Sequence, residues 1–476
     1  MCDYRQFRRL LRHHILGPEQ RESRMATTVS HTFAPDLSPI AIRNFSKERY
    51  VSPEWLERER TDLWATSWLV AGVACDVREA GQFITFDIGA ESIIIARGAD
   101  RLLRAMHNTC THRGTKLVTE PMGSLRKFVC PYHAWVYGLD GSLESVPGAA
   151  RFSNGVPREK LGLRPVEVEE ALGLIFVRLT PGALSLADFL APLHEAIGTY
   201  RLDLMDVTND QTVSHLCNWK AIIDNFAELY HVPFLHPIHR RMFDCATAPI
   251  ALFDHGHTAV YVEGGVTDSG FPTPEVPSDM QAMQLEAFGL DPADYRGLVG
   301  AIRPALQRAK RALAGEQGLA YDSFTDAQLT DVWQFNLFPN VILSVTPESA
   351  WLMRSRPDVT DPGRSILDMI TLVRFHGEES PEAAGSDEAD GARIGTHFRL
   401  NGPRPADYIR PPRDAFTHED IIAGRKTMTV TIDEDISLLG RVQQGMASRG
   451  FDSVWLSDEE CRVQHFHDAL DASLGA

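Results

Sequence analysis

The chain has 476 residues, of which 43% are hydrophobic and 23% are charged, and its formal net charge is -17 at pH 7. This length exceeds that of a single hydrophobic core, so we expect two packed domains. The acidic balance argues against nucleic acid as a partner, because proteins that bind phosphate backbones present clustered Lys and Arg. The sequence has no run of about eighteen apolar residues and no secretory signal, so we expect no membrane partner and a cytoplasmic location.

The first 180 residues divide into two expected segments. Residues 1–40 are expected to form a partly disordered N-terminal extension, because the first 24 residues are rich in Arg. A transit peptide is the alternative for those 24 residues. Residues 41–180 are expected to form an all-β domain, since short β-branched runs alternate with turn signals between Trp64 and Leu179. Its first helix is expected to pack on the domain that follows.

Residues 181–476 are expected to form a second domain of the α+β class, with an antiparallel sheet and helices. Helical periodicity begins at "LADFLAPLHEAI", and the later runs "VWQFNLFPNVILSV", "SAWLMRS" and "SILDMITLVRFH" predict strands of one sheet. Pro339 and Pro347 are expected at strand ends. The acidic segment 377–396 has few large apolar residues and predicts a solvated loop.

The sequence offers no nucleotide-binding signature. Neither G-x-x-x-x-G-K-[ST] nor G-x-G-x-x-G occurs in it. Reducing equivalents must therefore arrive from another protein. Its seven cysteines are irregularly spaced, so they indicate core residues or metal ligands rather than a disulfide framework.

Two short segments each combine one Cys with one His. "CTHRG" contains Cys110 and His112, and "CPYHAW" contains Cys130 and His133. A zinc finger usually groups its cysteines and its histidines separately, whereas two mixed loops can give both thiolates to one iron and both imidazoles to its neighbour. The pattern favours a Rieske [2Fe-2S] cluster, with a zinc knuckle as the alternative.

Residues beside these ligands are expected to support the two loops. Gly114 and Pro131 supply turn chemistry that lets each loop double back. Trp135 and Tyr132 are expected to shield the cluster from water, which helps to hold its potential.

The segment "NWKAIIDNFAELYHVPFLHP", residues 218–237, predicts a helix with one polar face. Asp224, Glu228 and His231 are spaced at i, i+4 and i+7, so they share that face, and Asn225 lies nearby. The opposite face is apolar. We therefore expect this helix to aim acids and an imidazole into a site.

A second imidazole follows at His236. An unbroken helix would place it about 140° round from His231, but Pro233 is expected to force Val232 out of helical geometry and to turn the chain back. Two imidazoles and one carboxylate on one face of a metal leave other positions open, as in non-haem Fe(II) sites that activate O2. The carboxylate is expected from elsewhere in the chain, and the helix that starts in "TIDEDISLL" offers Asp433, Glu434 and Asp435.

The motifs C-x-H-R-G, C-x2-H-x-W, N-W-K, D-N-x-x-E-x-Y-H, H-P and E-D-x-x-L-L-x-x-x-Q together resemble those of the Rieske non-haem iron oxygenase family, the ring-hydroxylating oxygenases, in their terminal oxygenase α subunit. The resemblance implies a [2Fe-2S] Rieske cluster on Cys110, His112, Cys130 and His133. It also implies a mononuclear Fe(II) on His231, His236 and Asp435, with Glu434 and Asp433 as the alternatives for the carboxylate. Ala134 stands where many relatives have Gly, a departure expected to change packing only slightly.

The acid three residues before the first histidine has a further role in this family, where it bridges to a Rieske histidine of the neighbouring subunit. By resemblance, Glu228 would orient His231 and connect it with His112 or His133 across the interface of a homotrimer or an α3β3 assembly. Asn225 would adjust the proton supply or the access to iron. Glu228 and Asn225 are therefore the candidate catalytic residues.

The resemblance implies a terminal oxygenase that uses O2 and electrons from an NAD(P)H-dependent reductase, with or without a ferredoxin, to dioxygenate an aromatic or hydrophobic ring. One alternative is monooxygenation, as hydroxylation or as oxidative N- or O-demethylation. Glu228 in place of Asp resembles relatives that act on quaternary amines. The other alternative is a Rieske electron-transfer protein, or a zinc-binding module, without oxygenase activity.

Overall fold

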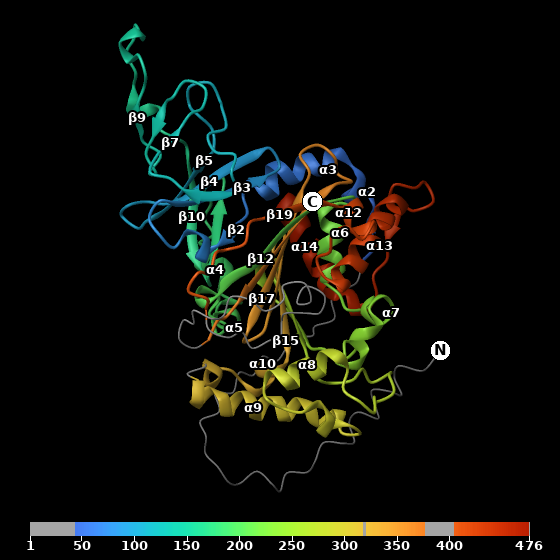
Figure 1. The fold of residues 1–476 in the computed structure, drawn as a ribbon. Coiled ribbons are helices and arrows are strands. Elements are labelled where there is room, and N and C mark those ends of the chain that lie inside the picture. Colours follow the sequence, from blue (N-terminus) through green and yellow to red (C-terminus); the bar gives the residue numbers. More distant parts are fainter. Residues whose placement is uncertain (1–42, 318–319, 377–403, 476) are drawn as a thin grey trace. The chain divides into compact units, whose positions relative to one another are not determined.

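The computed structural model describes residues 43–317, 320–376 and 404–475, which all belong to one compact unit, Leu37–Ala476 (Figure 1). Two predictions, the extension at residues 1–40 and the acidic loop at 377–396, lie outside the described residues. The boundary expected at residue 180 falls between the strand β11 and the helix α4, inside this unit. The division into two domains at that point remains a prediction.

Short hydrophobic strands build the first part of the described chain, as the β-branched runs predict. Seven of them form a sheet in the order β2, β11, β10, β5, β4, β3, β6. Their bounds are β2 (Leu69–Val73), β3 (Gln82–Ile88), β4 (Glu91–Arg97), β5 (Leu103–His107), β6 (Met122–Ser124), β10 (Pro165–Ala171) and β11 (Leu174–Arg178). In β4, Ile93 and Ile95 pack in one core and Ile94 in another, so both faces of this strand are buried. A smaller sheet contains β7 (Phe128–Val129), β8 (Val136–Tyr137) and β9 (Leu143–Ser145).

An eight-stranded sheet follows, in the order β13, β14, β15, β16, β17, β18, β12, β19. Its bounds are β12 (Asp206–His215), β13 (Ile250–Leu252), β14 (Thr258–Val262), β15 (Val332–Leu337), β16 (Val341–Val345), β17 (Ser349–Pro357), β18 (Ser365–Val373) and β19 (Asp414–Thr417). All neighbours are antiparallel except β12 and β19. Pro339 and Pro347 lie in the turns on either side of β16, as predicted. The α+β class is confirmed.

Helices pack against both faces of this sheet (Figure 1). One group contains α4 (Leu186–Leu190), α5 (His194–Gly198), α8 (Asp279–Ala287), α9 (Ile302–Gln317) and α10 (Asp326–Thr330). The other contains α2 (Glu48–Val51), α6 (Trp219–Phe226), α12 (His418–Ile422), α13 (Val430–Met446) and α14 (Cys461–Leu474). Among the helices of the described ranges, none has the length and the hydropathy needed to cross a bilayer.

A buried carboxylate joins the large sheet to the first one. Asp368 in β18 accepts hydrogen bonds from the guanidinium groups of Arg354 and Arg356 in β17. Arg354 Nη1 donates onward to the backbone carbonyls of Val70 (2.8 Å) and Ala71 (2.7 Å) in β2. Burial alone would raise the pKa of Asp368, but the two guanidinium groups outweigh burial and hold the pKa well below its ordinary value. The two sheets are therefore connected by a network of buried ion pairs and hydrogen bonds around Asp368 and Arg354.

The N-W-K motif fixes the start of α6. The Asn218 side chain accepts the Lys220 N–H (2.9 Å) as an N-cap. Trp219 Nε1 and Lys220 Nζ both donate to the buried carboxylate of Glu59, at 2.7 and 2.5 Å. Glu59 begins η3 (Glu59–Trp64), directly after α3 (Pro53–Arg58). The first helical segments are thus anchored to the helix that leads to the second candidate site.

Candidate metal centres

The two Cys and His loops have the same backbone design. In the first loop, the Cys110 N–H donates to Thr115 O (2.8 Å) and the Gly114 N–H donates to Cys110 O (2.9 Å). In the second, the Cys130 N–H donates to Trp135 O (2.8 Å) and the Ala134 N–H donates to Cys130 O (2.9 Å). Both loops therefore double back at the fourth residue after the cysteine.

This turn requires a left-handed residue at that fourth position. Gly114 has φ +78° and Ala134 has φ +56°. Glycine adopts such a conformation without strain, whereas a residue with a Cβ does so at a cost. Ala134 therefore acts on the backbone of the loop, and the expectation that it changes packing only slightly stays a prediction.

The four side chains of these loops offer the donor set of a [2Fe-2S] cluster. Cys110 and Cys130 are buried, and the rings of His112 and His133 lie 4.6 Å apart. Nδ1 of each ring is buried and has no hydrogen-bond partner among the described residues. Buried polar atoms are rarely left unpaired, so the two Nδ1 atoms fit the role of ligands. Two thiolates and two imidazole nitrogens are the Rieske set.

The surroundings of the loops support thiolate ligands. Burial would raise the pKa of Cys130, but the backbone N–H groups of Tyr132 and His133 outweigh it, so the pKa lies below its ordinary value. Tyr137 Oη lies 3.2 Å from Cys110 Sγ. Sequence reasoning missed Tyr137, because no spacing rule connects it to the cysteine.

The two aromatic residues expected to shield the cluster differ in exposure. Trp135 is buried and stacks on His112 at 4.6 Å with an interplanar angle of 7°. Tyr132 packs on His133 at 3.8 Å, yet it is 55% exposed. Trp135 therefore covers the His112 ring, whereas Tyr132 lies at the surface of the protein. The shielding of a cluster by these two residues stays a prediction.

The segment that carries the second set of ligands departs from the predicted helix. The helix α6 ends at Phe226, and a second helix, α7 (Val232–Leu235), begins after His231. Pro233 lies in the first turn of α7, where its missing N–H is tolerated, and Val232 is helical. The prediction of one helix that Pro233 breaks is therefore wrong. The break comes earlier, where the Glu228 carboxylate accepts the backbone N–H of His231 (3.1 Å).

His231, His236 and Asp435 come together despite this change. Their ligand atoms all lie within 4.8 Å of one another. Asp435 Oδ1 lies 2.9 Å from His236 Nε2 and 3.6 Å from His231 Nε2. Asp435 Oδ2 is buried without a hydrogen-bond partner in the part of the chain described. Two imidazole nitrogens and a carboxylate at this spacing fit a mononuclear metal with open positions.

Each imidazole of this group is held from behind by its own glutamate. His231 Nδ1 contacts Glu228 Oε1, and His236 Nδ1 lies 2.6 Å from Glu434 Oε2. These contacts put the proton on Nδ1 and leave Nε2 free to bind a metal. Burial lowers the pKa of His236, but Asp435 and Glu434 outweigh it and raise the pKa. A metal at Nε2 therefore competes with a proton, which weakens binding at acidic pH.

The structure separates the three acids that the sequence left as alternatives. Asp435 faces both imidazole Nε2 atoms, whereas Glu434 contacts the far side of the His236 ring. Asp433 accepts from Thr427 Oγ1 and from the Met428 N–H (2.9 Å). Glu434 and Asp433 are thus not placed to complete the triad.

Asn225 and Asp224 have different surroundings. Asn225 Nδ2 is buried and unpaired within the described ranges. Asp224 accepts from Tyr50 Oη (2.5 Å) and lies 3.1 Å from His467 Nε2, so it connects α6 with α2 and α14. Tyr50 and His467 are far away in the sequence, and no motif pointed to them.

Gln443, which closes the E-D-x-x-L-L-x-x-x-Q motif, connects the two helices of the metal site. Its Oε1 accepts the Asn218 N–H (2.9 Å), and its Nε2 donates to Tyr50 O (3.2 Å). The helix of Asp435 is thereby fixed to the start of α6.

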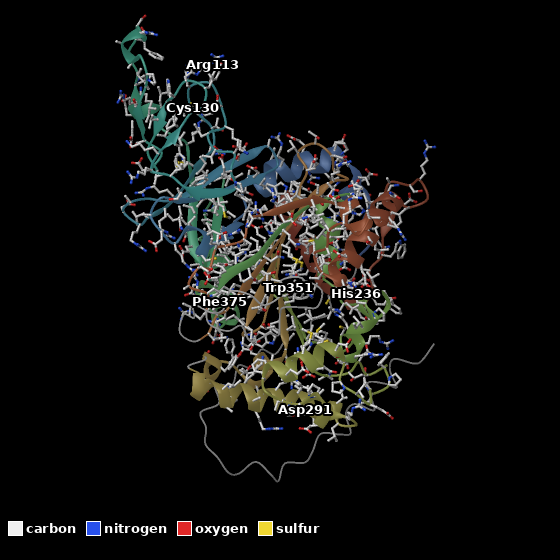
Figure 2. The ribbon with its side chains drawn as sticks, viewed as in Figure 1. Arg113, Cys130, His236, Asp291, Trp351 and Phe375 are labelled. Carbon is white, nitrogen blue, oxygen red and sulfur yellow. The ribbon has the colours of Figure 1, made fainter. Side chains whose placement is uncertain are left out.

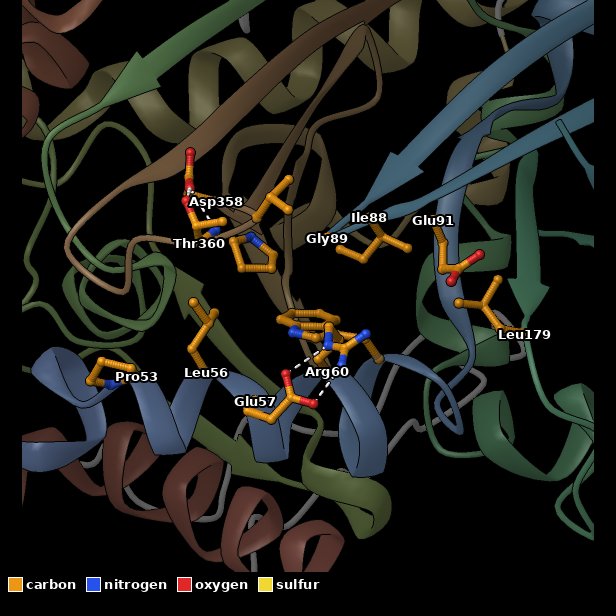
Figure 3. Close-up of a pocket in the computed structure, with 13 residues that line it drawn as sticks. Pro53, Leu56, Glu57, Arg60, Ile88, Gly89, Glu91, Leu179, Asp358 and Thr360 are labelled. Atoms are coloured by element: carbon orange, nitrogen blue, oxygen red, sulfur yellow. Dashed lines mark hydrogen bonds and ion pairs between the residues drawn. The ribbon is translucent and has the colours of Figure 1, made fainter. Parts of the chain in front are cut away.

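Two surface pockets lie away from these side chains. One of about 230 Å³ is lined by residues of α3, of the β3–β4 turn and of the β17–β18 turn, and contains the Glu57–Arg60 ion pair (Figure 3). The other, of about 620 Å³, is lined partly by residues of α14. Neither pocket is lined by a candidate ligand. In Figure 2 one residue of each candidate centre is labelled, Cys130 in the region of β7 and β9 and His236 beside α7.

Two models of known protein families match this chain, each over a different part of the sequence. A family model described as "Ring hydroxylating alpha subunit (catalytic domain)" matches residues 202–476. A second, described as "Rieske [2Fe-2S] domain", matches residues 67–163. The two matches contain all of the candidate ligands of both centres.

Curated relatives match part of the chain. The glycine betaine monooxygenase oxygenase subunit of Pseudomonas aeruginosa is 34% identical over 188 residues, 40% of this chain and 43% of that protein. The carnitine monooxygenase oxygenase subunit of Escherichia coli is 33% identical over 190 residues, 40% of this chain and 50% of that protein. The chloroplastic choline monooxygenase of Beta vulgaris is 33% identical over 225 residues, 46% of this chain and 50% of that protein. The matches thus span half or less of each relative.

Solved structures share the fold. A quaternary ammonium Rieske monooxygenase aligns with a TM-score of 0.63 and 18% identity, covering 91% of this chain and 96% of that one. Naphthalene 1,2-dioxygenase from Rhodococcus sp. aligns with a TM-score of 0.61 and 18% identity, covering 90% and 94%. At this identity the likeness shows the fold alone.

The strained position 134 generates a stability prediction. Ala134→Gly should raise the free energy of unfolding by roughly 0.5–1 kcal/mol, because relief of the left-handed conformation exceeds the added flexibility of the unfolded chain. Gly114→Ala is the matched control and should lower it by about 1 kcal/mol, since no atom lies within 4 Å of the added Cβ and only backbone strain changes. Denaturant unfolding of the cluster-loaded protein measures both. Destabilisation by Ala134→Gly would contradict this account.

The contact between His236 and Glu434 generates a metal-binding prediction. Glu434→Gln should weaken Fe(II) binding about tenfold or more, because the imidazole loses the carboxylate that fixes its orientation. Asp433→Asn makes the same chemical change on the neighbouring residue and should leave Fe(II) affinity unchanged. Competition with a coloured chelator gives both affinities, and the visible spectrum of the cluster checks the fold. Equal affinities in the two variants would refute the role of Glu434.

Proposed function

The chain belongs to the ring hydroxylating alpha subunit family, and from this premise we propose that it is the oxygenase subunit of a Rieske monooxygenase that oxidises a small quaternary ammonium compound. The observation that carries the proposed chemistry is the grouping of two imidazole Nε2 atoms with the Asp435 carboxylate. The substrate class is taken from the relatives, whose names specify glycine betaine, carnitine and choline.

In this proposal the two sets of side chains hold two iron centres. The cluster would be bound by Cys110, His112, Cys130 and His133, and the mononuclear iron by His231, His236 and Asp435. When bound, the cluster supplies single electrons and the mononuclear iron supplies open positions for O2. Glu228 and Glu434 hold the imidazoles in the tautomer that leaves Nε2 free. The unpaired Nδ2 of Asn225, at the end of α6, is free to donate a hydrogen bond to a group that delivers protons to the site.

Dioxygenation of an aromatic ring, expected from the family resemblance, has weaker support than monooxygenation. The three relatives are named monooxygenases. The likeness to naphthalene 1,2-dioxygenase is at 18% identity and concerns the fold alone. Glu228, in place of Asp, also favours the quaternary ammonium alternative. We therefore infer hydroxylation of an N-methyl group, which leads to demethylation.

The assembly proposed is a head-to-tail homotrimer that receives electrons from a separate reductase. Apolar side chains are exposed beside each candidate centre: Val129 (53%) and Tyr132 (55%) at the cluster loops, and Tyr230 (50%), Phe234 (78%) and Ile238 (58%) at the triad. Exposed apolar groups gathered in this way mark interaction surfaces. We propose that the loops of one subunit dock beside the triad of the next, with Glu228 as the bridging acid.

Substrate oxidation tests the proposed function. With a reductase and NADH, the enzyme should consume O2 with glycine betaine and form equal amounts of formaldehyde and the demethylated amine, since one oxygen atom enters the methyl group and the other leaves as water. His231→Ala should abolish this reaction and keep the visible spectrum of the cluster. Coupled O2 uptake with naphthalene but with no quaternary ammonium compound, and a cis-diol as product, would establish dioxygenation instead.

The exposed ring of Phe234 tests the assembly. Phe234→Glu should dissociate the trimer and slow electron transfer by about tenfold or more, because a charge in an apolar interface costs about 2 kcal/mol or more. Ile409→Glu is the matched control, since Ile409 is 85% exposed and lies away from both sets of ligands in the sequence. Sedimentation velocity and single-turnover kinetics measure the two effects. A trimer that survives Phe234→Glu would exclude this docking surface.

A further inference from the structure

Arg462, in the first turn of α14, is a buried cation without a counter-ion. Its side chain is 1% exposed and donates to Thr258 Oγ1 (3.0 Å), Gln334 Oε1 (3.1 Å) and Asn336 Oδ1 (2.7 Å), which are all neutral. Its Nη1 is buried and has no partner in the described ranges. No carboxylate of the described residues forms an ion pair with it. A buried charge that lacks a partner of opposite charge lowers the stability of the fold unless a ligand supplies that partner.

Other buried arginines of this protein are satisfied. Arg178 pairs with Glu167, and Arg354 and Arg356 share Asp368. Arg374 donates to backbone carbonyls of Pro347 and Tyr200. Arg462 differs in having both an unpaired nitrogen and only neutral partners. Its place in the chain is also unfavourable for a cation, because the N-terminus of a helix carries partial positive charge.

The neighbours of Arg462 lead to the candidate triad. Thr258 and Asn336 are opposite each other in β14 and β15, and Gln334 is opposite Val260 on the same strands. Val260 packs in one cluster with Met242, Phe243 and Leu229, residues on either side of the histidine segment. The polar group around Arg462 therefore adjoins an apolar cluster that contains residues from both sides of the histidine segment.

Charge also connects Arg462 with the site. Burial lowers the pKa of Arg462 to about 10, and the Cys461 thiol and the Glu228 carboxylate act against that shift. The guanidinium thus remains a cation at neutral pH. Glu228, one of the groups that raise the pKa of Arg462, also holds His231.

We propose that Arg462 binds the carboxylate of a zwitterionic substrate, a short chain with a quaternary ammonium group at one end and a carboxylate at the other. This inference rests on the proposed function and narrows its substrate class. A carboxylate that replaced the amide of Gln334, which is only partly buried, would accept from Nη2 and from the unpaired Nη1 together. Two parallel charged hydrogen bonds of this kind are strong and directional. The ammonium end, with its N-methyl groups, would then extend toward the triad.

This arrangement discriminates between otherwise similar quaternary amines. Glycine betaine has a carboxylate where choline has a hydroxymethyl group. A site with a buried guanidinium rejects a ligand that leaves it unpaired. The protein is therefore a betaine-type rather than a choline-type enzyme.

Three ligands of similar size test this inference by calorimetric binding to the iron-loaded protein. Glycine betaine has both charged ends, choline has only the ammonium, and 3,3-dimethylbutyrate has only the carboxylate. The unaltered protein should bind glycine betaine about 10- to 100-fold more tightly than choline. Arg462→Gln should remove this preference, because it weakens the binding of glycine betaine and of 3,3-dimethylbutyrate and leaves the affinity for choline unchanged. Arg462→Lys should restore part of it, because it keeps the charge without the fork.

A matched control and the cluster spectrum separate binding from folding. Arg178→Gln removes a buried guanidinium that is paired with Glu167, far from α14 in the sequence, and should leave all three affinities unchanged. A preference for choline in the unaltered protein, or full glycine betaine affinity in Arg462→Gln, would overturn the role of Arg462 while the proposed function stands. Binding of 3,3-dimethylbutyrate that depends on Arg462, without binding or oxidation of any quaternary amine, would support Arg462 and reject the proposed function.

Discussion

The fixed orientation of two imidazoles is the constraint on which the rest of the candidate site depends. Glu228 and Glu434 hold the Nδ1 atoms of His231 and His236, so both Nε2 atoms point toward Asp435. Without these two contacts either ring could present the wrong nitrogen. The cluster loops use the opposite arrangement, because there the buried and unpaired atoms are the Nδ1 atoms of His112 and His133. Histidine thus offers a different ring nitrogen at each centre, Nδ1 at the cluster loops and Nε2 at the triad.

The fold holds the elements of the triad in place through buried polar contacts. Asp435 lies on α13 and His231 lies after α6, and Gln443 joins these two helices by accepting the Asn218 N–H. Asp224 connects α6 with α2 and α14 through Tyr50 and His467. Buried polar groups of this kind stabilise a structure when their hydrogen bonds are made. The positions of the ligands therefore depend on four elements that are far apart in the sequence, α2, α6, α13 and α14.

Sequence reasoning found what local spacing determines. Cys110 and His112, with their counterparts twenty residues later, were recognisable because each loop contains a complete pair of donors. The prediction of one helix failed where a side chain determines the backbone, since the Glu228 carboxylate accepts the N–H of His231, the residue directly before α7. Spacing alone did not separate Asp435 from Glu434. Adjacent residues of a helix point in different directions, and only the position of His236 shows which of the two faces the metal site. Arg462 had no local signal, because its partners lie in two strands far away in the sequence.

The central claim is that His231, His236 and Asp435 bind one iron through the two Nε2 atoms and the carboxylate. Diffraction data from crystals of the iron-loaded protein, collected on both sides of the iron absorption edge, test it most directly. The account predicts one anomalous peak within bonding distance of these three side chains and a separate pair of peaks between the two cysteine loops. A single iron bound by Glu434 in place of Asp435, or no peak between the two imidazoles, would contradict it.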